Sequence, residues 1–284
     1  SRANLTDALG APGLLAQLLG ARSRVRALHL QHNALGAESF RAICSALPHN
    51  TALNVLEVQH NPFGREPKVG QQLANALRGA RGSQLVHLGV TLADAIHVNG
   101  KRGVTYVGNP HALLSAYANG PLHAVQALAL AGANVTPRSI EAFRKHRAHV
   151  FKSLTALDMS HAFVGPVGCY HLCEAVAGVR AGCTLTSLDL SYNRLGCDGA
   201  VSVGKLVERN RSLTALHARC NQIRGKGAAA LARSLERAAR RPVGSPVAVL
   251  ALGGRGERLG AQVGAARRRA DDARVHARLS PLGA

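Results

Sequence analysis

A histidine between two cysteines, Cys169, His171 and Cys173, is the most suggestive ligand pattern in this chain, since zinc prefers thiolate and imidazole ligands. The segment is expected to be helical, so the His171 ring points away from both sulfurs. The sequence also has no second cysteine or histidine pair at zinc-finger spacing. We therefore expect no metal site. The spacing of the six cysteines is unlike that of a small secreted scaffold, and the pattern favours reduced, buried thiols.

Two glycine-rich segments are candidates for nucleotide binding. Gly254, Gly256 and Gly260 follow an expected strand and precede an expected helix, but their spacing is G-x-G-x-x-x-G and not the dinucleotide-binding G-x-G-x-x-G. Residues 225–227, G-K-G, lack the upstream glycines of a phosphate-binding loop. The 14 histidines form no H-E-x-x-H motif and no recognisable Ser-His-Asp arrangement. We expect no cofactor, no small-molecule substrate and no enzymatic activity.

A repeated leucine pattern determines the elements that would position any site. The pattern is L-x-x-L-x-L-x-x-N-x-L-G, and the copies that open at Val25 and Leu53 are offset by 28 residues at every position. Eight candidate repeats open at residues 25, 53, 85, 125, 154, 185, 213 and 247. Self-similarity at such a period is the signature of a solenoid. The step of 40 residues after position 85 predicts an insertion near Val98 to Gly108, a segment rich in turn-forming residues.

Each repeat is expected to contain one short strand, an asparagine turn and one helix. Leu28 and Leu30 point to the same side of a strand because side chains alternate with a period of two. The turn asparagines can satisfy backbone groups that no sheet partner reaches, and they are Asn33, Asn61, Asn193 and Asn221. Alanine takes the place of asparagine at Ala93, Ala133 and Ala162, which predicts altered turns there. Glycines at positions 36, 64, 165 and 196 are expected to permit the turn into the helix.

The helical segments complete a resemblance to a known repeat class. Phe40, Ile43, Cys44 and Leu47 recur at helical spacing, as do equivalent residues in later repeats. One strand and one helix per 28 or 29 residues resembles the ribonuclease-inhibitor-like class of leucine-rich repeats. This resemblance implies an α/β solenoid of about eight repeats, curved, with parallel strands on the concave face and helices on the convex face. We expect an N-terminal helical cap at 1–24, repeats at 25–257 and a basic C-terminal helical cap or tail at 258–284.

The charge distribution suggests contact with a polyanion. Formal net charge is +20, and arginine supplies 29 of the 35 basic residues. Residues 201–284 hold 17 basic and 5 acidic groups, which gives them a net charge of +12. Arginine suits bidentate contact with phosphate, although its abundance also fits a GC-rich genome, and any one cluster also fits a solvated helical face. The nucleic-acid-binding candidates are Arg138, Arg144, Lys145, Arg147, Arg240, Arg241, Arg267, Arg268, Arg269 and Arg274.

Residues interleaved with the buried leucines should line the concave face. Most of them are small, and the polar ones are candidates for binding a protein partner: His29, Glu57, His87, Asp158, Asp189, His217 and Arg219. Because Arg219 is the only Lys or Arg among the lining residues, the excess positive charge is expected on the helices, the edges and the C-terminal end. The pattern therefore predicts two surfaces, one for protein segments and one for RNA phosphates.

These features favour a non-enzymatic scaffold subunit of a large ribonucleoprotein, most specifically a mitochondrial ribosome. The expected partners are other protein subunits and structured RNA, and the expected location is a reducing intracellular compartment, with the mitochondrial matrix preferred to the cytoplasm or cilium. Sequence hydropathy predicts no membrane association. The alternatives are a protein-interaction module of a ciliary or microtubule assembly and, third, a GTPase-activating leucine-rich repeat protein.

Overall fold

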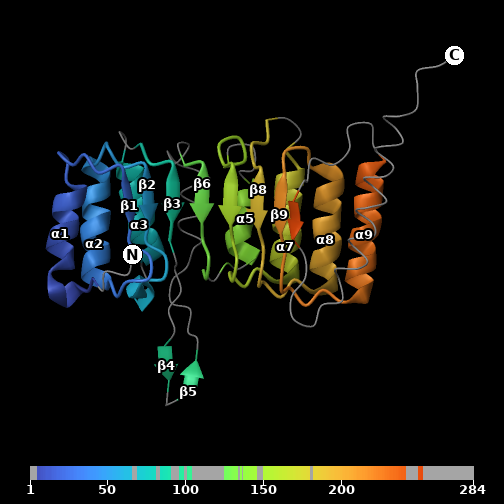
Figure 1. The fold of residues 1–284 in the computed structure, drawn as a ribbon, viewed down its shortest axis with the longest axis horizontal. Helices are drawn as coiled ribbons and strands as arrows, with labels where there is room; N and C mark the ends of the chain where they lie inside the picture. Colours follow the sequence, from blue (N-terminus) through green and yellow to red (C-terminus); the bar gives the residue numbers. More distant parts are fainter. Residues whose placement is uncertain are drawn as a thin grey trace.

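Strands and helices alternate along the chain in the computed structural model (Figure 1). The structure describes residues 5–65, 69–80, 84–90, 96–98, 101–103, 125–133, 135, 137–145, 150–179, 182–240 and 249–251. The strands form one layer and the helices form a second layer behind them, so each strand–helix unit stacks on the previous one. This arrangement is the α/β solenoid that the repeat pattern predicts.

The main sheet is open, parallel and eight-stranded, in the order β1-β2-β3-β6-β7-β8-β9-β10. Its strands are β1 (Ala27–His29), β2 (Val55–Glu57), β3 (His87–Gly89), β6 (Ala127–Ala129), β7 (Ala156–Asp158), β8 (Ser187–Asp189), β9 (Ala215–His217) and β10 (Val249–Ala251). The central residue of every strand is a leucine, and these leucines pair in register from Leu28 through Leu56 to Leu250. The predicted equivalence of the leucines is therefore confirmed.

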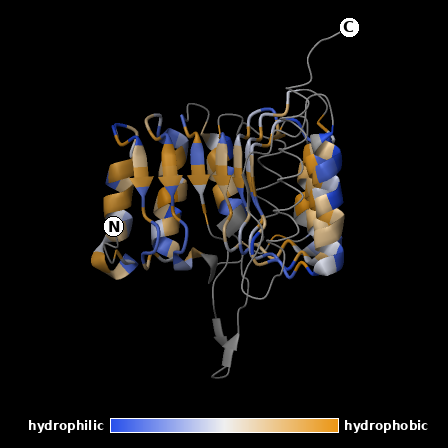
Figure 2. Cartoon of the chain, turned by 45° about the vertical axis from the view of Figure 1, so that its right-hand side comes forward, coloured by the Kyte–Doolittle hydropathy of each residue, from blue (hydrophilic) through white to orange (hydrophobic). Residues whose placement is uncertain are grey.

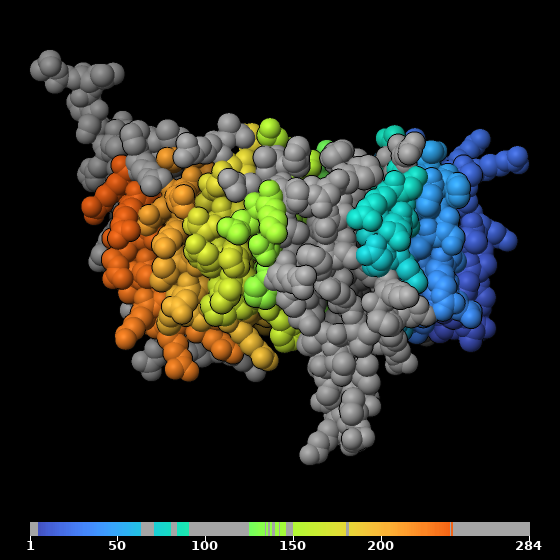
Figure 3. All heavy atoms as spheres, turned by 180° about the vertical axis from the view of Figure 1, so that it is seen from behind, coloured from blue at the N-terminus to red at the C-terminus, as the bar shows by residue number. Residues whose placement is uncertain are grey.

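The helices all lie on one side of the sheet (Figure 1). They are η1 (Asp7–Leu9), α1 (Ala11–Leu19), α2 (Ala37–Ala46), η2 (Leu47–His49), η3 (Pro62–Arg65), α3 (Val69–Gly79), α5 (Pro137–Lys145), α7 (Gly165–Ala177), α8 (Gly196–Arg209) and α9 (Gly225–Ala239). Figure 2 shows that the C-terminal helices turn their hydrophobic residues toward the sheet, as amphipathic helices do. Seen from behind, the segments follow one another in chain order across this helical face (Figure 3).

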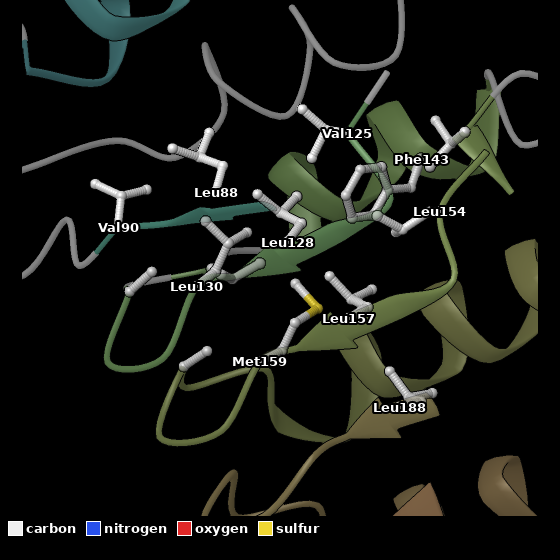
Figure 4. Close-up of a cluster of buried hydrophobic side chains, with 14 of the residues drawn as sticks. Leu88, Val90, Val125, Leu128, Leu130, Phe143, Leu154, Leu157, Met159 and Leu188 are labelled. Atoms are coloured by element: carbon white, nitrogen blue, oxygen red, sulfur yellow. The ribbon is translucent and has the colours of Figure 1, made fainter. Parts of the chain in front are cut away.

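The core is a continuous layer of aliphatic side chains between the sheet and the helices. In its central part, leucines from neighbouring strands stand in a row beside Met159 and Phe143 (Figure 4). Leu128, Leu157 and Leu188 are all at most 2% exposed. One cluster joins nearly the whole length of the solenoid, so each repeat buries its apolar face against its neighbours and not within itself.

Buried asparagines connect successive turns, as their position after the strand predicts. Asn193 Nδ2 donates to the Met159 carbonyl of the preceding repeat (2.7 Å) and to the Leu190 carbonyl of its own repeat (3.0 Å). Asn193 Oδ1 accepts from the backbone amides of Ala162 (2.9 Å) and Val164 (3.2 Å). The turn at Ala162 has no asparagine of its own, but it receives from Asn193 the same hydrogen bonds that the turn at Asn193 receives from Asn221.

Asp7 ties the N-terminal cap to the first repeat. Its carboxylate accepts hydrogen bonds from the backbone amides of Gly36 (3.0 Å), Glu38 (3.0 Å) and Ser39 (3.2 Å), and from the Ser39 hydroxyl. Partial burial raises the pKa of Asp7, but these hydrogen bonds outweigh it, so the pKa is lowered overall. Gly36 has an ordinary φ of −98°. Its role is to make room, because a Cβ there would lie 2.7 Å from the Asp7 carboxylate.

The expected insertion in the third repeat contains a β-hairpin. Strands β4 (Ile96–Val98) and β5 (Lys101–Gly103) pair antiparallel in a sheet of their own, separate from the main sheet. Figure 1 shows them projecting beyond the end of the strand layer. A solenoid can accept such an addition in a connecting segment, where the stacking of strands is left intact.

Candidate interaction surfaces

The strand face, defined as the side of the main sheet away from the helices, carries the residues that flank the central leucines. Small residues form one row in register across β6 to β9, at Ala127, Ala156, Ser187 and Ala215. The predicted protein-binding residues form two polar groups, one on β1 to β3 and one on β7 to β9. The strands supply His29, Glu57, His87, Asp158, Asp189 and His217, and the segment after β9 supplies Arg219. The face therefore combines a polar group at its N-terminal end with a small-residue row that runs beside the C-terminal polar group.

The N-terminal polar group is built around the Glu57 carboxylate. Glu57 Oε2 lies 2.6 Å from His29 Nδ1, and Glu57 Oε1 lies 3.0 Å from His87 Nε2. The Gln31 amide also donates to Oε2. His29 and Glu57 are directly paired in register across β1 and β2. The carboxylate is only 19% exposed, so it lies beneath two imidazoles that are more accessible, His29 at 55% and His87 at 31%.

The C-terminal polar group contains two neighbouring aspartates. Asp158 and Asp189 are paired in register across β7 and β8, and His217 of β9 pairs with Asp189. Each aspartate Oδ1 accepts the backbone amide two residues later, at 2.8 Å in both cases. Neither aspartate forms an ion pair with any other residue in the described ranges. Adjacent like charges on a sheet are unfavourable, so this end of the face is suited to a partner that supplies a cation.

A second surface, the loop edge, follows the turns that lead from the strands to the helices, and it was not found from sequence. One equivalent position has a left-handed backbone in each turn for which the structure describes it, with φ between 54° and 76°: His32, His60, Gly132, His161, Tyr192 and Cys220. Side chains at neighbouring turns stack. His32 and His60 rings lie 4.4 Å apart, and His161 and Tyr192 rings lie 4.1 Å apart and nearly parallel. The repeat spacing therefore creates a row of rings that alternation on the strands does not reveal.

A second row lies two residues further along the same turns. Phe163, Arg194 and Gln222 also have positive φ, and the Arg194 guanidinium lies 5.4 Å from the centre of the Phe163 ring. Phe163 is 38% exposed and Tyr192 is 49% exposed. The only sequence signal for these residues is their offset from the turn asparagine, and the repeat pattern places no constraint on side-chain type there.

Local contacts shift the pKa of two residues of the loop edge. Burial lowers the pKa of His60, the nearby His32 and His161 add to this effect, and Asp158 opposes it. His60 is therefore neutral at physiological pH, which allows it to stack closely on His32. A hydrogen bond with Cys220 is the main cause of the raised pKa of Tyr192, which keeps its hydroxyl protonated.

The predicted RNA-binding residues are only partly described. Arg144 and Lys145 are exposed on α5, where they lie 3.7 Å and 3.6 Å from the Glu141 carboxylate. Arg138 is in the same helix, and Arg240 is exposed at the end of α9. The remaining candidates, Arg147, Arg241, Arg267, Arg268, Arg269 and Arg274, lie outside the described residues.

The α-helices carry a small part of the positive charge. The sequence gives the seven described α-helices ten Lys and Arg residues and six Asp and Glu residues, a net of +4 out of the +20 of the whole chain. Glutamates of one helix also pair with arginines of the next. Glu174 of α7 lies 3.0 Å from Arg209 of α8, and Glu208 of α8 lies 3.2 Å from Arg237 of α9. The expectation of a strongly basic convex face therefore has limited support in the helices themselves.

The cysteine pair that suggested a metal site is part of the core. Cys169 and Cys173 are buried on α7 with their sulfurs 3.8 Å apart. The hydrogen bond with Cys169, together with burial, raises the pKa of Cys173. Within the described parts of the chain, no group of three or more His, Cys, Asp or Glu residues could hold a metal ion. The helices described there also include none that is long and apolar enough to cross a membrane.

The stacked parallel strands, backing helices and asparagine turns define a repeat solenoid with an open strand face. A family model described as "Leucine Rich repeat" matches residues 183–204 and 209–232, which contain β8, most of α8, β9 and the first half of α9. These residues therefore match leucine-rich repeats, and the fold is the α/β solenoid that the sequence pattern predicts. Among curated proteins there is no match.

Comparison with solved structures finds 68 matching chains. One of them is "Leiomodin-1 Actin-Binding Site 2 (ABS2)", with a TM-score of 0.41 and 15% sequence identity, over 58% of this chain and 91% of that chain. At this level of similarity the match carries no argument about function.

Proposed function

We propose that this chain is a non-enzymatic scaffold whose strand face binds a segment of a partner protein. The main supporting observation is a row of small side chains in register across β6 to β9, formed by Ala127, Ala156, Ser187 and Ala215, beside a polar row on β7 to β9. A flat surface without bulky side chains allows a partner backbone to approach closely. Leucine-rich repeats stack into extended surfaces of this kind, and solenoids use them for protein binding. Fold alone does not specify the partner, so the proposal depends on the surface.

Site-specific photocrosslinking can test this proposal in cells that express the chain. A photoreactive amino acid at Ala129, in the middle of the strand face, should capture a discrete protein partner. The same group at Val167, which is 57% exposed on α7, is the matched control on the helical face. An Ala129→Arg variant should lose the captured partner without loss of thermal stability. Equal crosslinking from the two positions, or undiminished binding by Ala129→Arg, would refute the proposal.

Contact with the phosphates of structured RNA is a second candidate function, favoured by the net charge of +20. In this proposal the chain is a ribonucleoprotein subunit, with the strand face still bound to protein. Each phosphate that is neutralised should contribute about 0.9 to the slope of log affinity against log salt concentration. If the affinity for cognate RNA does not change with salt concentration, contact with RNA phosphates is excluded as the basis of binding.

Three more specific assignments remain predictions from sequence. The mitochondrial ribosome requires co-sedimentation with ribosomal particles and a mitochondrial location. The ciliary or microtubule alternative requires co-sedimentation with microtubules. The GTPase-activating alternative requires faster GTP hydrolysis by a partner GTPase. Separate fractions from one cell extract can distinguish the first two, and a purified enzyme assay decides the third.

A further inference from the structure

The loop edge carries an exposed patch with both aromatic and cationic character. This aromatic–arginine patch consists of His161, Phe163, Tyr192 and Arg194, in the turns that connect β7 to α7 and β8 to α8. Aromatic residues make up only 3% of the chain. Phe40, Phe63, Phe143 and Phe151 are fully buried, whereas Phe163 and Tyr192 are exposed. The exposed rings of the patch therefore do not contribute to the hydrophobic core.

The turns themselves do not require these rings. The positions equivalent to Tyr192 are occupied by Gly132 and Cys220 in other repeats, and the position equivalent to Phe163 by Gln222. All of these residues have a left-handed backbone. For a residue other than glycine this conformation costs on the order of 1 kcal/mol or more. Cysteine and glutamine bear the same cost at the equivalent positions, so the backbone of these turns does not by itself select aromatic rings.

The orientation of the rings favours a peptide over nucleobases. Tyr192 and His161 are stacked on each other, and the face of Phe163 is covered by Arg194. Recognition of single-stranded nucleic acid uses free ring faces on which bases stack. Here each of these rings already has one face in contact with a neighbouring side chain. The patch also offers a tyrosine hydroxyl and a guanidinium group, which side chains of a protein partner can contact.

Positive charges predominate beside the rings, where one carboxylate, Asp189, also lies close enough to contribute to the raised pKa of Tyr192. Arg194, Arg219 and Arg224 are exposed in adjacent turns, and none forms an ion pair with another residue in the described ranges. The backbone holds Arg219 next to the patch, because the Tyr192 amide donates to the Arg219 carbonyl at 2.8 Å. Helices α7, α8 and α9 also begin at this edge, and no side chain caps them among the residues described. Their N-terminal dipoles add to the attraction for anions.

From this combination we propose that the aromatic–arginine patch is a second interaction site, which binds an acidic segment of a partner protein. An apolar side chain of the segment packs against the edges of Phe163 and Tyr192, and its carboxylates pair with Arg194 and Arg219. This site lies on the turns that follow the strands and shares only Arg219 with the strand face. Variants at Tyr192 and Arg194 therefore test it without changing the strand face.

A random-peptide library displayed on phage tests the proposal with the full chain. The library is first depleted on the Tyr192→Ala variant and then selected on the unaltered chain, so that peptides for the strand face are removed. The selected peptides should be enriched in Asp and Glu together with aromatic or branched apolar residues. Their affinities are then measured one by one through fluorescence anisotropy.

Matched variants locate the binding. Tyr192→Ala and Arg194→Glu should each weaken the selected peptides by about tenfold, as expected for central residues of an interface. Tyr170→Ala is the aromatic control, because Tyr170 on α7 is 47% exposed, close to the 49% of Tyr192. Arg233→Glu, on the exposed side of α9, is the charge control. Both controls should bind the peptides as the unaltered chain does, and Ala129→Arg on the strand face should have no effect.

Several outcomes would overturn the proposal. These are a selection that yields no peptides, peptides enriched in Lys and Arg, and peptides that bind the two patch variants as tightly as the unaltered chain. A labelled oligouridine that competes with the peptides and is weakened by the same variants would show that the patch is an RNA site instead. Circular dichroism of each variant confirms that lost binding does not reflect lost folding.

Discussion

Replacement of Asn193 with alanine should be unusually destabilising for a single polar residue. The side chain is fully buried and bridges two repeats. Its loss removes the donor to the Met159 carbonyl and the acceptor for the Ala162 and Val164 amides. Among the residues described, these three backbone groups have no other hydrogen-bond partner. The Leu190 carbonyl is less affected, because it also accepts from Asn221 at 2.8 Å.

The number of backbone groups left without a hydrogen-bond partner determines how much Asn193→Ala lowers the free energy of unfolding. A buried polar group without a partner costs about 1–3 kcal/mol, so three such groups suggest roughly 3–5 kcal/mol after some access by water. Asn33 is the matched comparison at the N-terminal end of the solenoid. Its Nδ2 also donates to two carbonyls, but its Oδ1 accepts only the Leu5 amide, at 3.3 Å. We expect Asn33→Ala to cost about 1–2 kcal/mol.

Equilibrium unfolding in urea, followed by circular dichroism, measures the two free energies of unfolding. The difference between Asn193→Ala and Asn33→Ala should be at least about 1 kcal/mol in the stated direction. Hydrogen exchange at the Ala162 and Val164 amides provides a local check, because these amides should lose protection in the Asn193 variant. Equal destabilisation by the two variants, with both amides still protected, would show that the asparagine does not bridge the repeats as argued here.

Three further predictions concern the cap, the helix layer and the thiols. Asp7→Ala should lower the free energy of unfolding by about 0.5–2 kcal/mol at pH 7, because it removes the cap of α2. The pKa of Asp7 is lowered in the folded state, so the difference in unfolding free energy between the two proteins, measured in urea, should shrink as pH falls below about 4. A difference that stays constant with pH would contradict an ionised cap. Gly227→Ala should destabilise the fold by about 1–3 kcal/mol, because the added Cβ would lie 2.9 Å from Cys197 Cα. A Cβ added at Gly225 would have no neighbouring atom within 4 Å, so Gly225→Ala should leave the thermal unfolding nearly unchanged. Equal effects of the two variants would mean that the helices adjust freely. Burial raises the pKa of Cys44 to about 12, so iodoacetamide at pH 8 should label this thiol more slowly than Cys197, which is likewise partly exposed. Mass spectrometry measures the two rates, and similar rates would show that the surroundings of Cys44 do not suppress its thiolate.

The sequence predicted the sheet because the features that form it are periodic. Leucine at every strand centre fixes both the buried side of each strand and the register between neighbours. The asparagine turns were predictable for the same reason, since one residue type recurs at one offset. The turn at Ala162 was harder, because the group that completes it, Asn193, belongs to the next repeat. A repeat read by itself does not reveal a hydrogen bond supplied by its neighbour.

Features outside the periodic pattern were not predictable. The hairpin of β4 and β5 occurs once, so no other repeat gave it a precedent. Asp7 precedes the first repeat, and its role as a cap depends on a contact with Ser39 that is 32 residues distant in sequence. The ring stacks of the loop edge were missed because residues such as Tyr192 occupy positions where the hydrophobic pattern has no preference. These positions are also the ones where residues are free to vary for binding.

The geometry of the repeat relates both interaction surfaces to possible partners. Neighbouring parallel strands lie about 4.8 Å apart, so equivalent residues on the strand face and on the loop edge recur at this spacing. The strand spacing brings His161 and Tyr192 into a stack with a ring separation of 4.1 Å. The same spacing holds the like charges of Asp158 and Asp189 side by side. The same two repeats, those that begin with β7 and β8, therefore carry an acidic pair on one surface and a cationic aromatic patch on the adjacent one. A partner that contacts both must present basic and acidic groups in separate segments, which favours two bound segments over one and is consistent with a scaffold.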